Sequence, residues 1–358
     1  MRLHRLIKIE TEILLLLTLL LFSFSCDKDQ GTNPEEKTTV NVSPLHTEGR
    51  WIVNDEGKKM MLRGVNIPSL EWTSTGDNML ESVEEAITVW GCNILRIPLA
   101  QDRWFGKTSE QNDEGRAYQA LVDRLIEAAR AESTYTWLDL HWNNGGEWGT
   151  YIGQHIMPDK YSLEFWKDVA VKYKNDPAVL FGIYNEPYGI SWEIWRNGGT
   201  VDENYNRNGE QAQLRYEAVG HQQLVDSIRA LGANNIVIAA GIDWGYDLSG
   251  VLKGYALSGE NIVYDTHPYP GKDANWDAKW GNIGEQYPLI VGEWGTSEKD
   301  YQYFNDIKYY LKQHQFCWLA WCFHPDAGPQ LLEDWNYTPT FFGEIVMQEL
   351  ATPMEIED

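Results

Sequence analysis

The sequence predicts a single (β/α)8 barrel, the TIM barrel of the α/β class. From about Trp51 onward, short apolar runs alternate with longer amphipathic segments, and strands buried on both faces produce such runs. The chain has 358 residues, and without an N-terminal stretch outside the fold this length suits one such barrel. Strand–helix alternation repeated about eight times favours a closed parallel barrel over a doubly wound sheet.

The predicted strands are short and are bounded by turn residues or helix ends. They span Met60–Asn66, Asn93–Leu99, Tyr135–His141, Val179–Asn185, Asn235–Ala240, Ile262–His267, Leu289–Glu293 and Cys317–Phe323. Spaced apolar positions predict helices over Asp77–Trp90, Gly115–Glu132, Ser162–Tyr173, Glu210–Leu231 and Lys299–His314. Long insertions, Gln101–Glu114 and Gly189–Gly209, follow the second and fourth strands. They should lie where the loops of this fold shape binding grooves.

The composition limits the classes of partner. The formal net charge is −24, and so acidic a surface repels phosphates, which excludes nucleic acid. The chain also contains 17 Trp and 19 Tyr, and this excess of rings suggests stacking platforms in addition to core. Sugar rings present flat C–H faces that stack on indoles, so a polysaccharide partner fits this composition.

The N-terminus has the pattern of an export signal. A basic segment precedes an apolar run over Ile13–Phe22 that is too short to span a bilayer comfortably, and Cys26 follows it directly. We interpret residues 1–25 as a lipoprotein-type signal peptide, Cys26 as the lipidated residue, and 26–44 as a flexible polar tether to a domain over 45–358. This predicts a cell-surface or outer-membrane lipoprotein of a Gram-negative bacterium, with plain secretion as the alternative and the membrane touched only through the lipid.

The cysteines indicate neither a disulfide framework nor a zinc site. Besides Cys26, the chain has Cys92, Cys317 and Cys322, which is an odd number with unsuitable spacing. Apolar surroundings predict buried free thiols. No histidine–carboxylate set has metal-ligand spacing along the chain, so we expect no catalytic metal and no cofactor.

Polar residues end several of the apolar strands, at the face where this fold builds active sites. They are Arg96, His141, Asn185, Glu186, His267, Tyr269, Glu293 and Trp321. The fourth strand ends in Asn185-Glu186-Pro187, and the seventh ends in Glu293. Two carboxylates that face one pocket suit glycoside hydrolysis, which needs one carboxyl to protonate the leaving oxygen and another to attack the anomeric carbon or direct water.

These motifs resemble glycoside hydrolase family 5, the large cellulase and mannanase family. The resemblance runs from about Leu62 to Phe323 and includes Arg63-Gly64-Val65-Asn66 on the first strand and Asn185-Glu186-Pro187 on the fourth. It implies a retaining mechanism with Glu186 as general acid/base and Glu293 as nucleophile. That mechanism requires the two carboxyl groups to lie about 5–5.5 Å apart, whereas inversion requires about 6.5–9.5 Å.

The resemblance also implies supporting roles. Arg96 matches the arginine that keeps the nucleophile ionised, and Asn185 would bind the sugar 2-OH. His141 matches the strand-three histidine, His267 and Tyr269 match the strand-six pair, and Trp321 matches the tryptophan beneath the cleaved sugar.

Among the other aromatic residues that follow strand ends, we expect Trp244 and Trp148 to line sugar subsites, with core packing as the alternative. His155 is expected to be a loop or surface residue rather than a catalyst. The predicted activity is that of an endo-acting β-1,4-glucanase of the cellulase type, a monomer acting on a β-linked polysaccharide. The alternatives are the same chemistry on β-mannan, xyloglucan or mixed-linkage glucan, and a non-catalytic surface carbohydrate-binding protein.

Overall fold

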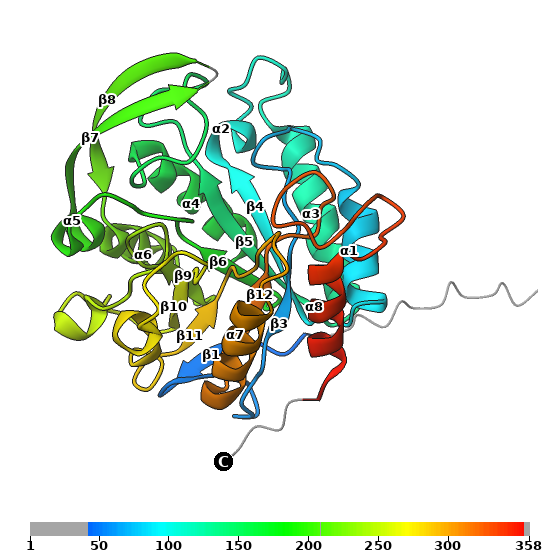
Figure 1. Ribbon diagram of the computed structural model, residues 1–358. Helices are drawn as coiled ribbons and strands as arrows, with labels where there is room; N and C mark the ends of the chain where they lie inside the picture. The colour runs from blue at the N-terminus through cyan, green and yellow to red at the C-terminus, as the bar shows by residue number, and fades with distance from the viewer. Residues whose placement is uncertain (1–41, 208, 354–358) are drawn as a thin grey trace, which may run out of the picture. The chain divides into compact units, whose positions relative to one another are not determined.

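Eight parallel strands close into a barrel, which confirms the predicted fold (Figure 1). We describe residues 42–207 and 209–353 of a computed structural model. Each predicted strand segment overlaps one barrel strand. The strands are β3 (Arg63–Asn66), β4 (Ile94–Ala100), β5 (Tyr135–Trp142), β6 (Val179–Gly182), β9 (Val237–Ala240), β10 (Ile262–Thr266), β11 (Leu289–Val291) and β12 (Cys317–Ala320). The last strand pairs with the first, with Trp318 opposite Arg63, and so the barrel has no free edge.

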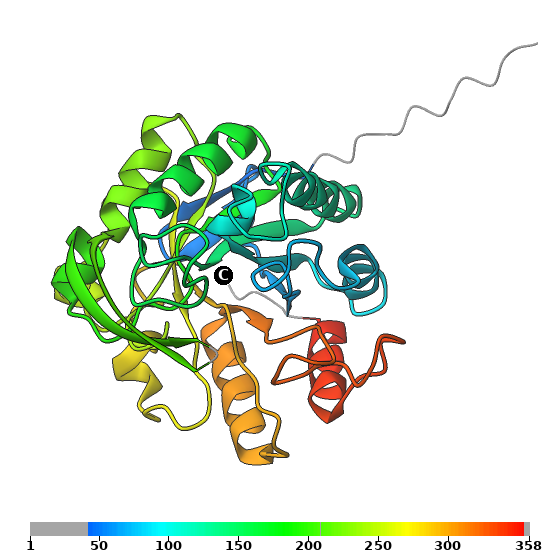
Figure 2. The ribbon, with the colours of Figure 1, turned by 90° about the horizontal axis from the view of Figure 1, so that it is seen from above.

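The helices form a ring around the barrel (Figure 2). The longer ones are α1 (Met79–Thr88), α3 (Arg116–Ala131), α4 (Lys160–Tyr173), α6 (His221–Ala230), α7 (Tyr301–His314) and α8 (Phe341–Ala351). Short ones are α2 (Gln101–Trp104), α5 (Trp192–Asn197), the 3-10 turn η1 (Val251–Lys253) and the π-helical turn η2 (Asp277–Gly281). The start of α4 shows how the sequence sets a boundary, because the Asp159 side chain accepts the N–H groups of Tyr161 and Ser162.

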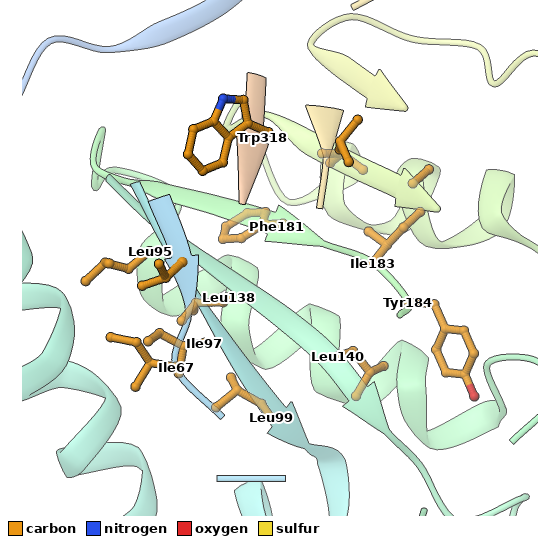
Figure 3. Close-up of a cluster of buried hydrophobic side chains, with 14 of the residues drawn as sticks. Ile67, Leu95, Ile97, Leu99, Leu138, Leu140, Phe181, Ile183, Tyr184 and Trp318 are labelled. Atoms are coloured by element: carbon orange, nitrogen blue, oxygen red, sulfur yellow. The ribbon is translucent and has the colours of Figure 1, made fainter. Parts of the chain in front are cut away.

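Alternate residues of each strand face opposite sides of the barrel wall. On β4, Leu95, Ile97 and Leu99 face the helices and belong to the outer apolar layer (Figure 3). Ile94 belongs instead to the inner apolar cluster, and two residues further along the strand Arg96 also faces inward. The barrel interior is therefore apolar near the strand starts and polar near the strand ends, where the predicted site residues lie.

The segment after β6 differs from the predicted helix. Glu210–Leu231 was expected to be helical, but Glu210–Val219 is the strand β8, which pairs antiparallel with β7 (Gly198–Arg207). Only α6 in the second half of the segment is helical. The hairpin buries Val201, Leu214 and Tyr216 against the loop that follows β5. Every second residue of each strand faces inward, which is the period of a strand and not of a helix.

A second hairpin closes the amino-terminal end of the barrel. It consists of β1 (Leu45–Glu48) and β2 (Trp51–Asn54), and Leu45 and Ile52 join the inner apolar cluster with Ile94. The predicted signal peptide, the tether up to residue 41 and Cys26 lie outside the described residues. No helix within the described residues is long and apolar enough to cross a bilayer. Cys92, Cys317 and Cys322 are buried free thiols, as predicted.

Candidate active site

Glu186 and Glu293 converge at the carboxyl-terminal end of the barrel. The chain leaves β6 at Gly182 and reaches Glu186, and it leaves β11 at Val291 and reaches Glu293. One carboxylate oxygen of each glutamate and one ring nitrogen of His267 all lie within 4.8 Å of one another. The strands that carry the two glutamates are separated by β9 and β10 in the barrel, so only closure of the barrel brings their ends together.

The carboxylate of Glu293 is buried and fully engaged. Its Oε1 accepts a hydrogen bond from Arg96 Nη1 at 2.6 Å, and its Oε2 accepts one from the Tyr269 hydroxyl at 2.8 Å. Burial alone would raise the pKa of Glu293, but the positive charges of His267 and Arg96 outweigh burial and lower the pKa to about 2. Glu293 is therefore held as an anion at neutral pH.

Arg96 is a buried cation surrounded by acceptors. Besides Glu293, its guanidinium donates to Asn66 Oδ1 at 2.8 Å, to Asn185 Oδ1 at 2.6 Å and pairs with Asp139 Oδ2 at 2.9 Å. Burial opposes the charge, but Asp139 and Glu293 raise the pKa of Arg96 above its ordinary value. Because a buried charge is tolerated only when it is paired, these acceptors hold the guanidinium in one place, against Glu293.

His267 links the two glutamates. Its Nδ1 lies 2.8 Å from Glu186 Oε1 and 3.7 Å from Glu293 Oε2, and its Nε2 lies 3.0 Å from Asp265 Oδ2. Burial opposes protonation of the ring, but the carboxylates of Glu293 and Asp265 raise the pKa of His267 well above its ordinary value. The ring is thus held as a cation that donates to Glu186 on one side and to Asp265 on the other.

Glu186, His267 and Glu293 form a set with the spacing of metal ligands. The sequence does not reveal this set because the three residues lie far apart along the chain. Their donors are already used. Both oxygens of Glu293 accept hydrogen bonds, both nitrogens of His267 face carboxylates, and the Arg96 guanidinium stands beside Glu293. A divalent cation placed here would displace these partners and would be repelled by Arg96, so the donor set suits acid–base chemistry better than metal binding.

Glu186 is the more accessible of the pair. Its side chain is 19% exposed, against 5% for Glu293, so the leaving group of a substrate and a water molecule can reach it. Gln154 supports its backbone, because Nε2 of Gln154 donates to the Glu186 carbonyl at 2.8 Å. The Gln154 Oε1 accepts from the side chain of Asn185 at 3.0 Å, which orients that amide toward Arg96 as well.

His141 and Trp321 form one wall of the site. The rings stack with centroids 5.3 Å apart and planes 9° from parallel. His141 Nδ1 contacts Asp139 Oδ2 at 2.8 Å, and Trp321 Nε1 donates to the carbonyl of Gly328 at 3.2 Å. Trp321, which directly follows β12, is half-buried and held flat by these contacts, as a stacking platform for a sugar would be.

The two tryptophans expected at sugar subsites have different surroundings. Trp244 is 46% exposed, and its backbone N–H donates to the carbonyl of Pro187, next to Glu186. The ring contacts of Trp148 are with Tyr161, at a centroid distance of 3.8 Å, and with Phe105. The structure thus brings Trp244 to the site and packs Trp148 among loop and α4 side chains.

His155 lies in the loop after β5, as expected, but it is fully buried and not at the surface. Its Nδ1 contacts Glu203 Oε2 at 3.0 Å, and Glu203 belongs to the hairpin that the sequence did not predict.

Several functional neighbours were missed by sequence reasoning. They are Asn66, Asp139, Gln154, Glu203 and Asp265. Asp139 and Asp265 could have been found, because each lies two residues before a predicted site histidine and therefore on the same inward face of its strand. Gln154 lies in the loop after β5 and Glu203 in the insertion after β6, and their contacts depend on how these segments fold.

Comparisons with known proteins agree with this geometry. The family model described as Cellulase (glycosyl hydrolase family 5) matches residues 53–327. An endoglucanase of Paenibacillus polymyxa is 26% identical, over 86% of this chain and 87% of the relative. Endoglucanase A of Butyrivibrio fibrisolvens is 23% identical over 72% of this chain, which spans only 53% of that relative. A β-glucanase of Saccharophagus degradans has the same fold, with a TM-score of 0.68 at 24% identity over 86% of this chain and 93% of that one.

Proposed function

Because this chain belongs to glycosyl hydrolase family 5, and is therefore a glycoside hydrolase, we propose that it is a retaining endo-β-1,4-glucanase with Glu186 as acid/base and Glu293 as nucleophile. One observation carries the proposal: carboxylate oxygens of Glu186 and Glu293 lie within 4.8 Å of each other in contrasting environments. This proximity of single oxygens supports the retaining separation of about 5–5.5 Å between carboxyl groups over the inverting one of about 6.5–9.5 Å.

In the first step, Glu293 attacks the anomeric carbon while Glu186 protonates the glycosidic oxygen. The buried anion of Glu293, held by Arg96 and Tyr269, can attack without first losing a proton. The more exposed Glu186 lies on the side from which the leaving sugar departs. The bond from the anomeric carbon to the leaving oxygen breaks, and a covalent glycosyl-enzyme forms.

In the second step, water hydrolyses the glycosyl-enzyme. Glu186, which has given up its proton, accepts one from the incoming water, and Glu293 leaves as the anion that it was at the start. The His267 cation lies between the two carboxyl groups, where it stabilises negative charge on either one as the charge moves.

The names of the relatives support a β-1,4-glucan as the substrate of this chain. Two relatives are named endoglucanases, and a Saccharophagus degradans β-glucanase of the same fold was solved in complex with cellotetraose, with a TM-score of 0.68 and 23% identity. Trp321 and Trp244 offer rings of the kind that stack on glucose.

The proposal is tested by reducing-sugar release from carboxymethylcellulose, glucomannan, xyloglucan and mixed-linkage glucan. We expect the fastest release from the β-1,4-glucan, with a rapid fall in viscosity that marks internal cleavage. The matched control is Glu293→Gln, which should lose about 10⁴-fold or more in kcat because the nucleophile is absent. Preference for another backbone would reassign the substrate. Binding without release from any of them would make the chain a carbohydrate-binding protein.

We propose in addition that the chain is exported and anchored to a cell surface or outer membrane through Cys26. The basic segment, the short apolar run and the cysteine directly after it support this proposal. In a Gram-negative host, a fatty-acid label should attach to the protein and be lost in Cys26→Ser, with the activity moving to the soluble fraction. Label retained by Cys26→Ser would contradict the anchor, and soluble wild-type enzyme would favour plain secretion.

A further inference from the structure

Glu203 is a buried carboxylate on β7 that lies outside the catalytic group yet contacts two segments leading to it. The hairpin β7–β8 rises at the upper left of Figure 1. Glu203 points inward from it and is 5% exposed. Its Oε2 accepts from the backbone N–H of Ile156 at 3.4 Å and contacts His155 Nδ1 at 3.0 Å, and its Oε1 accepts from the Tyr188 hydroxyl at 2.7 Å.

The first of these links joins Glu203 to His155 in the loop after β5. The Nε2 of His155 faces the carbonyl of Tyr151, and its Nδ1 faces Glu203, so both ring nitrogens meet acceptors. Glu203 also accepts from the Ile156 N–H and the Tyr188 hydroxyl, so its carboxyl group is held by three partners. Removing one partner alone would leave the other as a buried polar group without its hydrogen bond, so this contact holds the loop after β5 to the hairpin.

That loop supports the acid/base. Gln154 precedes His155 and donates to the Glu186 carbonyl at 2.8 Å, while it accepts from the side chain of Asn185 at 3.0 Å. The carbonyl of His155 accepts from the Tyr184 hydroxyl at 2.8 Å, which fixes the same loop to the residue before Asn185. A shift of His155 would therefore move the support of Glu186.

The second contact leads to Trp244. The Tyr188 ring, whose hydroxyl donates to Glu203, stacks on the Trp244 ring with centroids 4.8 Å apart and planes 7° from parallel. Trp244 has a positive φ of 55°, an unusual conformation for a bulky residue that its surroundings must maintain. Its N–H donates to the Pro187 carbonyl at 3.0 Å.

We propose that Glu203 is a positioning residue that fixes both Glu186 and the Trp244 platform from the β7–β8 hairpin. This rests on the proposed function and extends it to the leaving-group side of the cut. Glu203 acts through His155 and Gln154 on the proton donor, and through Tyr188 on the ring beside it. The insertion after the acid/base strand thus determines how the departing sugar is held and protonated.

The test compares two substrates that share the cellobiosyl unit. The dinitrophenolate of dinitrophenyl cellobioside departs as a stable anion, without proton donation, and this substrate has no sugar on the leaving-group side of the scissile bond. Cellotetraose needs both proton donation and a leaving sugar. For Glu203→Gln we expect kcat/KM on cellotetraose to fall about tenfold or more, with a change below about twofold on dinitrophenyl cellobioside. An equal loss on both substrates, or no loss on either, would overturn the proposal.

Two further variants keep the test decisive. Tyr188→Phe removes a single hydroxyl and should raise KM on cellotetraose while its activity on dinitrophenyl cellobioside is kept, even if Glu203→Gln folds poorly. An unchanged KM would contradict the proposed link from Glu203 through Tyr188 to Trp244.

Asp202→Asn is the matched control. Asp202 neighbours Glu203 but lies on the outward face of the hairpin, where it pairs with Arg215, and the two side chains are 67% and 71% exposed. It should leave both substrates unaffected. Wild-type enzyme inactive on both would refute the proposed function itself.

Discussion

At the scale of single residues, the site depends on keeping one carboxylate charged inside the barrel. Two oppositely charged groups and one hydroxyl secure Glu293: Arg96 at 2.6 Å, His267 at 3.7 Å and the Tyr269 hydroxyl at 2.8 Å. Because the lowered pKa of about 2 depends on these partners, each of them can be tested by its effect on pH dependence.

Tyr269→Phe removes one donor to the Glu293 anion and should raise the pKa of that carboxyl. Since a nucleophilic carboxylate, the role proposed for Glu293, reacts only when it is ionised, the acid side of the pH profile of kcat/KM should move to higher pH. The measurement is kcat/KM on dinitrophenyl cellobioside from pH 3 to 8, a substrate that does not need proton donation. An acid limb unchanged from wild type, with activity merely scaled down, would mean that Tyr269 does not tune Glu293.

Arg96→Met should destabilise the fold as well as abolish activity. It leaves Asp139 and Glu293 as buried carboxylates without their shared cation, which costs about 3–5 kcal/mol. Urea unfolding at pH 7 measures the loss. The difference should shrink as pH falls through the folded pKa of Glu293, since the stabilisation from a lowered carboxyl pKa is present above the unfolded pKa and lost below the folded one. The exposed Arg215→Met is the control and should cost below about 0.5 kcal/mol.

At the scale of elements, the alternation of strand residues explains how one sequence supplies both core and chemistry. Asp139 and His141 share the inward face of β5, while Leu138 and Leu140 pack outward on the helices (Figure 3). The apolar runs and the polar residues that end them were therefore enough to predict the strands and the site face. The β7–β8 hairpin was not predicted, because its Glu, Gln and Ala residues are also good helix formers. The dipeptide Asn208-Gly209 between the two segments is a hairpin-turn signal in the sequence.

Gly64 on β3 tests how closely the strands approach. A Cβ added there would lie 1.8 Å from the backbone carbonyl oxygen of Ile94 on the paired strand, and neither backbone can move without opening the barrel. Gly64→Ala should therefore destabilise by about 3 kcal/mol, as severe overpacking does. Gly57→Ala is the control: it meets open space at a φ of +75° and should cost about 1 kcal/mol. Equal thermal shifts for the two variants would contradict this account of the β3–β4 contact.

At the scale of the whole molecule, closure of the barrel creates the site. Residues from Asn66 to Trp321 meet at one end only because β12 pairs with β3. The sequence could predict which residues end the strands, since that depends on local pattern. It could not give the contacts of Gln154, Glu203 or Trp148, since these depend on how the loop after β5 and the insertion after β6 fold over the rim. The match to the family model covers the barrel that carries the site. The packing of the β7–β8 hairpin, in contrast, is known only from the structure of this chain.

We propose that Glu293 forms a covalent bond to the sugar during the reaction. A dinitrophenyl cellobioside with fluorine in place of the 2-hydroxyl slows the second step, so the glycosyl-enzyme accumulates and can be digested and weighed. We predict one added sugar unit on the peptide that contains Glu293, and none in Glu293→Gln. A label on any other residue, or no label with a hydrolysis product of inverted anomeric configuration, would contradict the account.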